Sequence, residues 1–304
     1  MFNLLKSDFY RLVRRGDFWV FTAVLVVGIS ACAALLSWVA SPDFAVMVNE
    51  RAADNAGLTA AEQVEAQADL DEDMAEMASL NDKAMDSLTY TWAQTFLTGG
   101  MLGVLGTALA ALFLVSDFDH GFVKNLLMSR RGRRIYFAEK LVFIALIQAI
   151  MLGLCAAVTT ASFAVAGFTY EVVGTPGELA LWLGLAWLLS CAYAFIAAVV
   201  TWLTRSKWLG TVLAVMVSTG VTGAVVAGLC SGFAPALPWL GTVPPWLLHS
   251  CTQLLGNSAS TLLAADTGLP VPGLPIWGHV LLVGGLWAAM CVAVTMAVCR
   301  KRDI

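Results

Sequence analysis

Six long runs of uncharged, mostly apolar residues constrain the fold of this 304-residue chain more than any other feature. Each run exceeds the roughly 20 residues that an α-helix needs to cross a hydrocarbon core about 30 Å thick. Charged residues make up 12% of the chain, about half of the roughly 25% found in soluble domains. The sequence therefore predicts an all-α membrane protein, a single domain over residues 1–304, with six transmembrane helices at 18–40, 93–115, 141–168, 180–203, 208–230 and 277–299.

Lysine and arginine are distributed very unevenly between the segments that join these runs. If the runs alternate in direction, one side of the membrane holds 15 of the 17 Lys and Arg residues, and the other side holds only Arg51 and Lys83. Cytoplasmic segments carry such an excess of basic residues. We therefore expect both termini in the cytoplasm, together with the other basic segments; these inner segments are 1–17, 116–140, 204–207 and 300–304.

The first 17 residues have the pattern of a helix that lies in the membrane interface. Apolar residues recur at helical spacing and basic residues are interleaved between them, so one face suits acyl chains and the other suits phosphates. We expect Arg11, Arg14 and Arg15 to anchor this helix to lipid headgroups. The apolar positions are Phe2, Leu5, Phe9 and Leu12.

Two long segments are expected on the outer side of the membrane. Residues 41–92 hold 12 acidic and two basic residues, and Thr59 with Glu62 matches a capping box, which predicts a helical loop. Its acids are expected to be mostly solvated, with attraction of a cationic ligand as the alternative. Residues 231–276 contain seven prolines and predict a re-entrant or interfacial segment, packed on the outer mouth of the bundle.

The usual signatures of catalytic and metal sites do not occur in this sequence. It contains no Walker A sequence for ATP binding and neither HExxH nor GxSxG. Its seven cysteines have no CxxC or CxxH spacing, which argues against a metal or redox site. A disulfide between Cys230 and Cys251 is left open. No catalytic, cofactor-binding or metal-binding residue is predicted, and no nucleic acid partner is expected.

The six runs contain polar residues but no charged ones. Ion-coupled transporters usually place a titratable group within the membrane, so ion coupling is disfavoured. Hydroxyl and amide groups can line a pathway for an amphiphilic molecule, or they can hydrogen-bond neighbouring helices instead. The candidates for lining a pathway are Gln148, Thr159, Thr160, Tyr193, Ser218, Thr219 and Thr222.

Residues 116–140 form the most cationic segment of the chain and also contain an apolar cluster. The cluster comprises Phe122–Val123 and Leu126–Met128, and a plain connector between two membrane helices does not need it. We interpret it as a short surface helix whose apolar side docks on a cytoplasmic partner. The arginines expected to anchor the segment at the membrane are Arg130, Arg131, Arg133 and Arg134.

The same segment resembles the region that follows the second span in ABC-exporter permeases of the second type. That family typically shows an acid-aromatic-x-x-Gly-Thr-x-Lys-Asn pattern, then Ser-Arg and a Lys that opens the third span. Phe122 stands where Thr is usual. The expected topology is also similar, most of all to the bacterial branch associated with bacitracin and lantibiotic self-protection. The matching residues are Asp117-Phe118-x-x-Gly121-Phe122-x-Lys124-Asn125-x-Leu127, Ser129-Arg130 and Tyr136-x-x-x-Lys140.

This resemblance implies a non-catalytic subunit of an exporter in a bacterial plasma membrane. ATP and Mg²⁺ would bind a separate cytoplasmic ABC ATPase, and this chain itself would hold no cofactor. Six spans are half the usual complement, so a second copy in a homodimer, or a paralogous permease, would complete the transporter. The segment after the second span would be a coupling helix, with ATPase-docking residues Asp117, Gly121, Phe122, Lys124, Asn125, Leu126 and Leu127.

Two functions follow from these observations. The favoured one is ATP-driven export of an amphiphilic molecule, such as an antimicrobial peptide, a drug or a lipid, which would provide resistance to antimicrobial peptides. The alternative is a non-transporting sensor or immunity protein that binds a cationic peptide through the acidic residues of 41–92. A membrane-embedded enzyme is the third option.

Overall fold

The computed structural model describes residues 2–39, 87–119, 130–204, 207–263, 269–271 and 273–301, together with the single positions 44, 47, 62, 64 and 68. The predicted acidic loop therefore lies mostly outside the described residues, and so does the predicted docking stretch from Gly121 to Leu127. The helices are α1 (Phe2–Arg14), α2 (Gly16–Val39), α5 (Leu88–Trp92), η2 (Ala93–Thr98), α6 (Met101–Asp119), α8 (Arg130–Val165), α9 (Pro176–Thr204), α10 (Lys207–Ser218), α11 (Val221–Phe233), η3 (Pro238–Thr242), η4 (Pro244–Trp246), α12 (Leu248–Leu255), η5 (Ala259–Leu263) and α13 (Ile276–Lys301).

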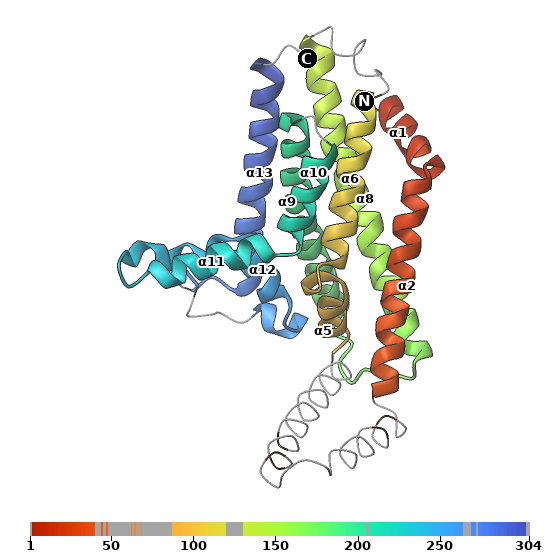
Figure 1. The fold of residues 1–304 in the computed structure, drawn as a ribbon, viewed down its shortest axis with the longest axis vertical. Helices are drawn as coiled ribbons and strands as arrows, with labels where there is room; N and C mark the ends of the chain where they lie inside the picture. The colour runs from red at the N-terminus through yellow and green to blue at the C-terminus, as the bar shows by residue number, and fades with distance from the viewer. Residues whose placement is uncertain are drawn as a thin grey trace.

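The long helices run side by side as a bundle, with α1 packed across one end (Figure 1). Four of them, α2, α8, α9 and α13, are each long and apolar enough to cross a membrane, and two bent pairs of helices raise that number to as many as six. The most apolar stretch of α9 is 61% buried, whereas that of α2 is 17% buried. The centre of the bundle is therefore α9, and α2 lies at its edge with one side facing outward.

Local sequence explains where the central helix α9 begins. Thr175 and Glu178 form a reciprocal capping box, in which the Thr175 amide donates to Glu178 Oε2 over 2.8 Å and the Glu178 amide donates to Thr175 Oγ1 over 3.3 Å. Pro176 occupies the first helical position, where its missing N–H costs nothing. The helix consequently starts four residues before the predicted span at 180.

Two of the predicted spans are bent rather than straight. The second predicted span, 93–115, is made of α5 and η2 followed by α6, with a 44° bend between the two parts. The fifth, 208–230, is made of α10 followed by α11, with a 60° bend. Gly100 and Gly220 lie at the two bends with φ of +72° and +75°, a left-handed conformation that glycine adopts without steric cost and that interrupts a helix.

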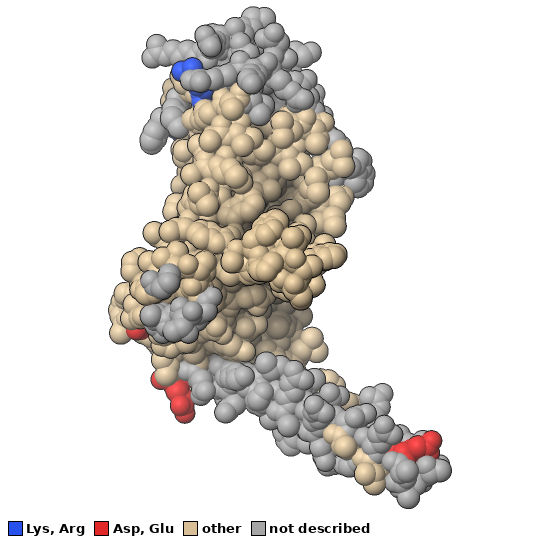
Figure 2. Space-filling view, turned by 90° about the vertical axis from the view of Figure 1, so that its left-hand side faces the viewer, with Lys and Arg blue, Asp and Glu red and all other residues tan. Residues whose placement is uncertain are grey.

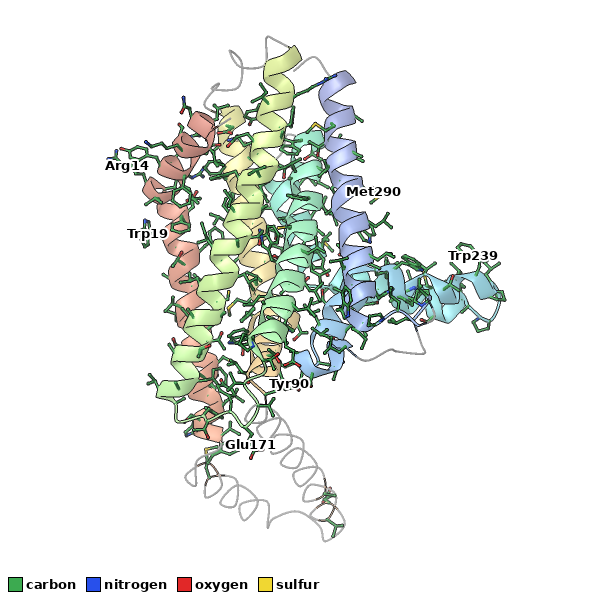
Figure 3. All side chains as sticks on the ribbon, turned by 180° about the vertical axis from the view of Figure 1, so that it is seen from behind. Arg14, Trp19, Tyr90, Glu171, Trp239 and Met290 are labelled. Carbon is green, nitrogen blue, oxygen red and sulfur yellow. The ribbon has the colours of Figure 1, made fainter. Side chains whose placement is uncertain are left out.

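The second half of the fifth predicted span, α11, leaves the bundle. Figure 1 shows α11 projecting sideways, roughly across the direction of the other helices. None of its 13 residues is buried. Figure 3 places Trp239, which belongs to η3, near the tip of this projection, far from α2. The chain then returns through η4 to α12, which packs on α9 and α13.

Charge is concentrated toward the two ends of the molecule. Figure 2 shows basic side chains near one end, acidic side chains toward the other, and a middle region without visible charge. Arg14 and Glu171 lie at opposite ends of the bundle in Figure 3. This arrangement suits a bundle whose middle lies in hydrocarbon, where a charged side chain is costly.

Candidate functional site

A buried ion cluster at the end of the bundle near the N-terminus joins three helices. Asp8 and Arg11 come from α1, Asp117 comes from the last turns of α6, and Lys140 comes from α8. The Lys140 ammonium contacts Asp8 Oδ2, and its Nζ lies 2.6 Å from Asp117 Oδ2. Arg11 Nη2 lies 2.8 Å from Asp117 Oδ1, and Arg11 Nη1 lies 3.3 Å from Asp8 Oδ1. The Tyr136 hydroxyl donates to Asp117 Oδ2 over 3.0 Å.

The cluster is sealed from solvent by aromatic rings. Lys140, Asp117 and Asp8 are 1%, 0% and 3% exposed. The Lys140 ammonium lies 4.9 Å from the centre of the Phe113 ring and 5.2 Å from that of Tyr136, distances at which the ring face attracts a cation. Removing one member of a buried ion pair leaves the opposite charge buried without a partner. Such a loss lowers the stability of the fold by about 3–5 kcal/mol.

A third carboxyl group lies in the same region. Glu139 is 1% exposed, and its carboxyl group interacts with that of Asp8. The cluster and its surroundings thus bring three acidic residues together with Arg11 and Lys140 at the end of the bundle where α1 packs on α8. Such a network has one well-defined arrangement, because moving any member leaves a buried charge without its partner.

The two helix bends form a second notable arrangement, deeper in the bundle. Thr107 Oγ1 on α6 donates a long hydrogen bond, 3.4 Å, to Ser218 Oγ at the end of α10. A methyl group at Gly100 would lie 3.4 Å from Thr219 Cα, so the bend in one span touches the bend in the other. Beneath them, the His249 ring of α12 fills the space beside Gly220, and burial lowers the pKa of His249, which favours the neutral ring.

A lateral groove lies between α2 and α8. Its volume is about 640 Å³ and its lining is uncharged, made of alanines, serines, Val165 and the larger Trp38. Ser30 Oγ and Ser162 Oγ hydrogen-bond across it over 3.1 Å, and Ser37 Oγ donates to the Ala166 carbonyl over 3.3 Å. Since these hydroxyls bond within the protein, the groove suits an alkyl chain better than a polar ligand. No group of metal-binding side chains occurs among the described residues.

Comparison with known protein families shows which family this chain belongs to. The family model described as ABC-2 family transporter protein matches residues 2–303, which is nearly the whole chain. The chain belongs to this ABC-2 transporter family. No curated protein and no solved structure matches it.

Membership in the ABC-2 family gives the ion cluster a context. In the ABC-2 chain, Asp117 and Lys140 are the acid and the lysine of the motif recognised in the sequence, at the two ends of the segment that connects α6 to α8. The structure brings these two ends together, 2.6 Å apart, and adds Arg11 and Asp8 from α1. Asp117 is fully buried and faces this cluster, so its carboxylate holds helices together inside the subunit rather than lying on a docking surface.

The other predicted docking residues of the ABC-2 chain lie outside the described residues. These are Gly121, Phe122, Lys124, Asn125, Leu126 and Leu127. The same applies to the side chains of Arg130, Arg131 and Arg133, whereas Arg134 is exposed.

The predicted lipid-anchoring arginines of α1 have partners within the protein. Arg11 belongs to the ion cluster, and Arg15 donates to Ser116 Oγ over 2.6 Å and pairs with Asp17 over 2.5 Å. Arg14 is exposed and stacks on the Tyr10 ring, with its guanidinium carbon 4.5 Å from the ring centre. Of the three, Arg14 is best placed to reach a lipid headgroup.

The predicted pathway residues separate into buried and exposed groups. Gln148 and Thr159 are 0% exposed, and their side chains have no hydrogen-bond partner within the described part of the chain. Thr160 accepts from Trp92 Nε1 over 3.0 Å, and Tyr193 pairs with the Thr252 hydroxyl over 3.1 Å. Thr160 and Tyr193 therefore hydrogen-bond to neighbouring helices, and Gln148 and Thr159 are buried between packed helices.

The remaining three pathway candidates lie at the bend of the fifth span. Ser218 is buried, whereas Thr219 and Thr222 are exposed, and both threonine hydroxyls donate to the Met216 carbonyl, over 3.2 and 2.7 Å. These two threonines therefore present polar atoms on the outer surface of the bundle at the level of the bend.

Two features differ from, or were missed by, the sequence interpretation. Cys230 and Cys251 are both free thiols, so the disulfide that was left open is not formed; Cys251 is buried in α12 whereas Cys230 lies on the projecting α11. Asp8 was not predicted as a site residue. Its signal was available: it lies three positions after Leu5 and four before Leu12, on the apolar face of α1, where an acid requires a buried partner.

Proposed function

We propose that this chain is a six-span permease subunit of an ATP-driven ABC exporter, with each bent pair of helices counted as one span. Membership in the ABC-2 family supports the role of permease and the need for an ABC ATPase. The observation that carries the proposal is the ion cluster, because it fixes the end of α6, from which the predicted coupling segment leaves, to α1 and α8. A push on that segment then reaches three helices at once.

The proposed assembly places ATP and Mg²⁺ in the ATPase chain and pairs this subunit with a second copy or a paralogue. Both termini lie in the cytoplasm in this proposal, on the side of the ion cluster. The excess of Lys and Arg in the inner segments supports that orientation, and Arg14 would then meet the phosphates of the inner leaflet.

The proposed cargo is amphiphilic, for example an antimicrobial peptide, a drug or a lipid. Between the charged ends of the bundle, the spans offer hydroxyl groups and apolar surface but no charge, so a cargo must be recognised by shape and by a few hydrogen bonds. Thr219 and Thr222 supply exposed oxygen atoms at the bend of the fifth span, a position that a second permease subunit could share. Export, rather than import, is the direction that the family resemblance implies.

The test is purification of the chain together with the ABC ATPase encoded beside it. We expect the ATPase to co-purify, and we expect candidate peptides or lipids to stimulate ATP hydrolysis by the complex in proteoliposomes. Gly121→Pro, or Phe122→Asp combined with Leu126→Asp, should abolish co-purification while the spans remain inserted. Arg134→Ala, an exposed change on the adjoining helix, is the matched control and should have no effect. Co-purification that survives both docking variants would refute docking through this segment.

A deletion in the acidic loop distinguishes the exporter from the alternative, a non-transporting sensor. Removing 59–82 should leave transport and ATPase stimulation intact if the protein is an exporter whose loop is solvated. Loss of the cellular response to a cationic peptide, in a protein that shows no nucleotide-dependent transport, would favour the sensor instead.

A further inference from the structure

We propose that Gly103 and Ser218 transmit movement from α6 to α10, so that the two bent spans pivot together at their breaks. This inference rests on the proposed function, because the movement it describes begins when an ATPase pushes on the segment after α6. Gly103 and Ser218 are positioning residues in this scheme: they contact no cargo, and they set where the exposed Thr219 at the end of α10 lies.

The two breaks have the same construction. In the second span, the π-helical η2 ends and Gly100 adopts φ of +72° before α6 begins. In the fifth span, α10 ends and Gly220 adopts φ of +75° before α11 begins. Left-handed glycines and π-helical turns both interrupt the regular helical hydrogen bonds, and a few such residues absorb the changes in backbone angle when helices pivot.

The two breaks are in direct contact through the smallest residues available. A methyl group built on Gly103 would lie 3.0 Å from the Ser218 carbonyl oxygen and 3.1 Å from Ser218 Cβ, and one built on Gly100 would lie 3.4 Å from Thr219 Cα. Thr107 and Ser218 add a hydroxyl contact one turn away. Since there is no slack between the backbones, α6 cannot tilt toward α10 without displacing it.

The region beyond the breaks is held to unbent helices. The Trp182 indole of α9 donates to the Leu255 carbonyl over 3.1 Å, and the Trp287 indole of α13 donates to the Trp246 carbonyl over 3.0 Å. His279 Nε2 lies 2.9 Å from the Pro245 carbonyl oxygen. These bonds attach η4 and α12 to α9 and α13. We call residues 244–263 the platform.

The platform also supports the outer half of both bent spans. Thr89 Oγ1 of α5 accepts from the Ala259 amide over 2.9 Å, and Gln94 of η2 donates to the Gly256 carbonyl over 3.3 Å. His249 packs against Gly220 and Gly223 at the start of α11. The outer halves are therefore fixed to the platform. The helices α6 and α10 pack on each other and on α9, so the movement that we propose is one of α6 and α10 as a pair along α9.

The geometry gives a defined route for the movement. It enters α6 near Asp117, where the ion cluster ties that helix to α1 and α8, and it crosses to α10 where Gly103 meets Ser218. Thr219, directly after that contact, is exposed and would shift with the end of α10, whereas Thr222 lies in α11, which the platform holds. The nucleotide state of the ATPase would thereby change the surroundings of Thr219.

The experiment uses the complex with the co-encoded ATPase, in a permease whose seven cysteines are replaced. Thr219→Cys serves as reporter, and the measurement is its rate of labelling by a maleimide with Mg-ADP and with Mg-ATP plus vanadate. Four forms are compared: unmodified at position 103, Gly103→Ala, Gly103→Ala with Ser218→Gly, and Gly153→Ala. The last is the matched control, because a methyl group at Gly153 meets no atom within 4 Å.

We expect labelling to depend on nucleotide in the unmodified protein and in G153A, with at least a threefold change in rate. G103A should lose most of this dependence because the added methyl group presses on the Ser218 carbonyl oxygen and Cβ, and S218G should restore part of it because it removes the Cβ contact and leaves the carbonyl contact. ATP hydrolysis should continue in all forms. A nucleotide dependence in G103A equal to that of the unmodified protein would overturn the inference.

A disulfide arm tests the same contact without requiring the G103A variant to fold well. Gly103→Cys and Ser218→Cys place their Cβ atoms close to the roughly 3.5–4.5 Å that a disulfide needs, so oxidation should join them in the isolated subunit. Because the contact persists while both helices pivot, the cross-linked complex should keep its nucleotide-dependent labelling. Loss on oxidation with recovery on reduction would mean that the helices must separate, and would overturn the inference. If instead the unmodified complex shows no nucleotide response at all, the proposed function itself fails, and this inference fails with it.

Discussion

Replacing Lys140 by Met should destabilise the protein more than any other single loss of charge in the described residues. Lys140 is the buried cation between Asp8 and Asp117, and both carboxylates are almost completely enclosed. Methionine preserves the length of the side chain and removes only the charge and the donors. Of the cations of the cluster, only Arg11 then remains for the two buried carboxylates, and its side chain is 29% exposed; the Tyr136 hydroxyl still donates to Asp117.

The expected magnitude follows from the geometry. Breaking a buried ion pair by removing one partner costs about 3–5 kcal/mol, and the remaining contacts of Arg11 at 2.8 and 3.3 Å place Lys140→Met at the lower end of this range. A loss of about 3 kcal/mol corresponds to a fall in the melting temperature of about 6–12 °C, on the scale of about 2–4 °C per kcal/mol for domains of 150–250 residues.

The assay is thermal unfolding of the purified protein in detergent, followed by tryptophan fluorescence, for which the chain has 11 tryptophans. Arg134→Met is the matched control, since it removes an exposed cation from the same helix and should cost less than about 1 kcal/mol. Adding Asp8→Asn to Lys140→Met removes one charge of each sign, so this double variant should recover part of the loss. A Lys140→Met variant that melts within 2 °C of the unmodified protein, or an Asp8→Asn change that deepens the loss, would refute the account of a sealed cluster.

Three further outcomes follow from particular contacts. Gly220→Ala should lower the melting temperature, because a left-handed alanine costs about 1–2 kcal/mol and its methyl group would lie 2.5 Å from His249 Nδ1. Adding His249→Ala should restore part of the lost stability. An unchanged melting temperature in Gly220→Ala would show that the bend straightens freely. Gln148→Met should raise stability by about 1–3 kcal/mol, because both amide atoms are buried and have no hydrogen-bond partner among the described residues. Lower stability, or lost transport, would instead give Gln148 a binding role. Asp17→Asn, which breaks only the exposed pair with Arg15, should change stability by less than about 1 kcal/mol, and a larger effect would place that pair in a drier environment than its exposure indicates.

The placement of the membrane helices could be read from the sequence because the bilayer imposes it directly. No water is available in hydrocarbon to bond peptide groups, so a spanning segment must be a helix of about 20 apolar residues. Four of the six predicted positions hold a single helix long and apolar enough to span, and the second and fifth hold bent pairs of helices. The family was also legible, since Asp117, Lys140 and the residues between them carried the resemblance that the match over residues 2–303 supports at the level of the ABC-2 family.

The bends were harder to predict, although glycines marked them. The pair Gly99–Gly100 and the lone Gly220 lie inside apolar runs that contain several other glycines. A glycine permits a left-handed turn and does not require one. The turn occurs at Gly220 because the His249 ring occupies the space beside it, and at Gly100 because the end of α10 lies against it. Both causes come from distant parts of the chain.

The sequence by itself determined that this protein is a helical membrane bundle with one basic end, because hydropathy and the distribution of Lys and Arg act segment by segment. Only the tertiary structure decided which charges meet and which helix breaks touch. Asp8 and Lys140 are 132 positions apart, and Thr107 and Ser218 are 111 apart, and no local pattern specifies such pairs. They are chosen by packing, because a buried charge must find a partner and a close helix contact must find small residues.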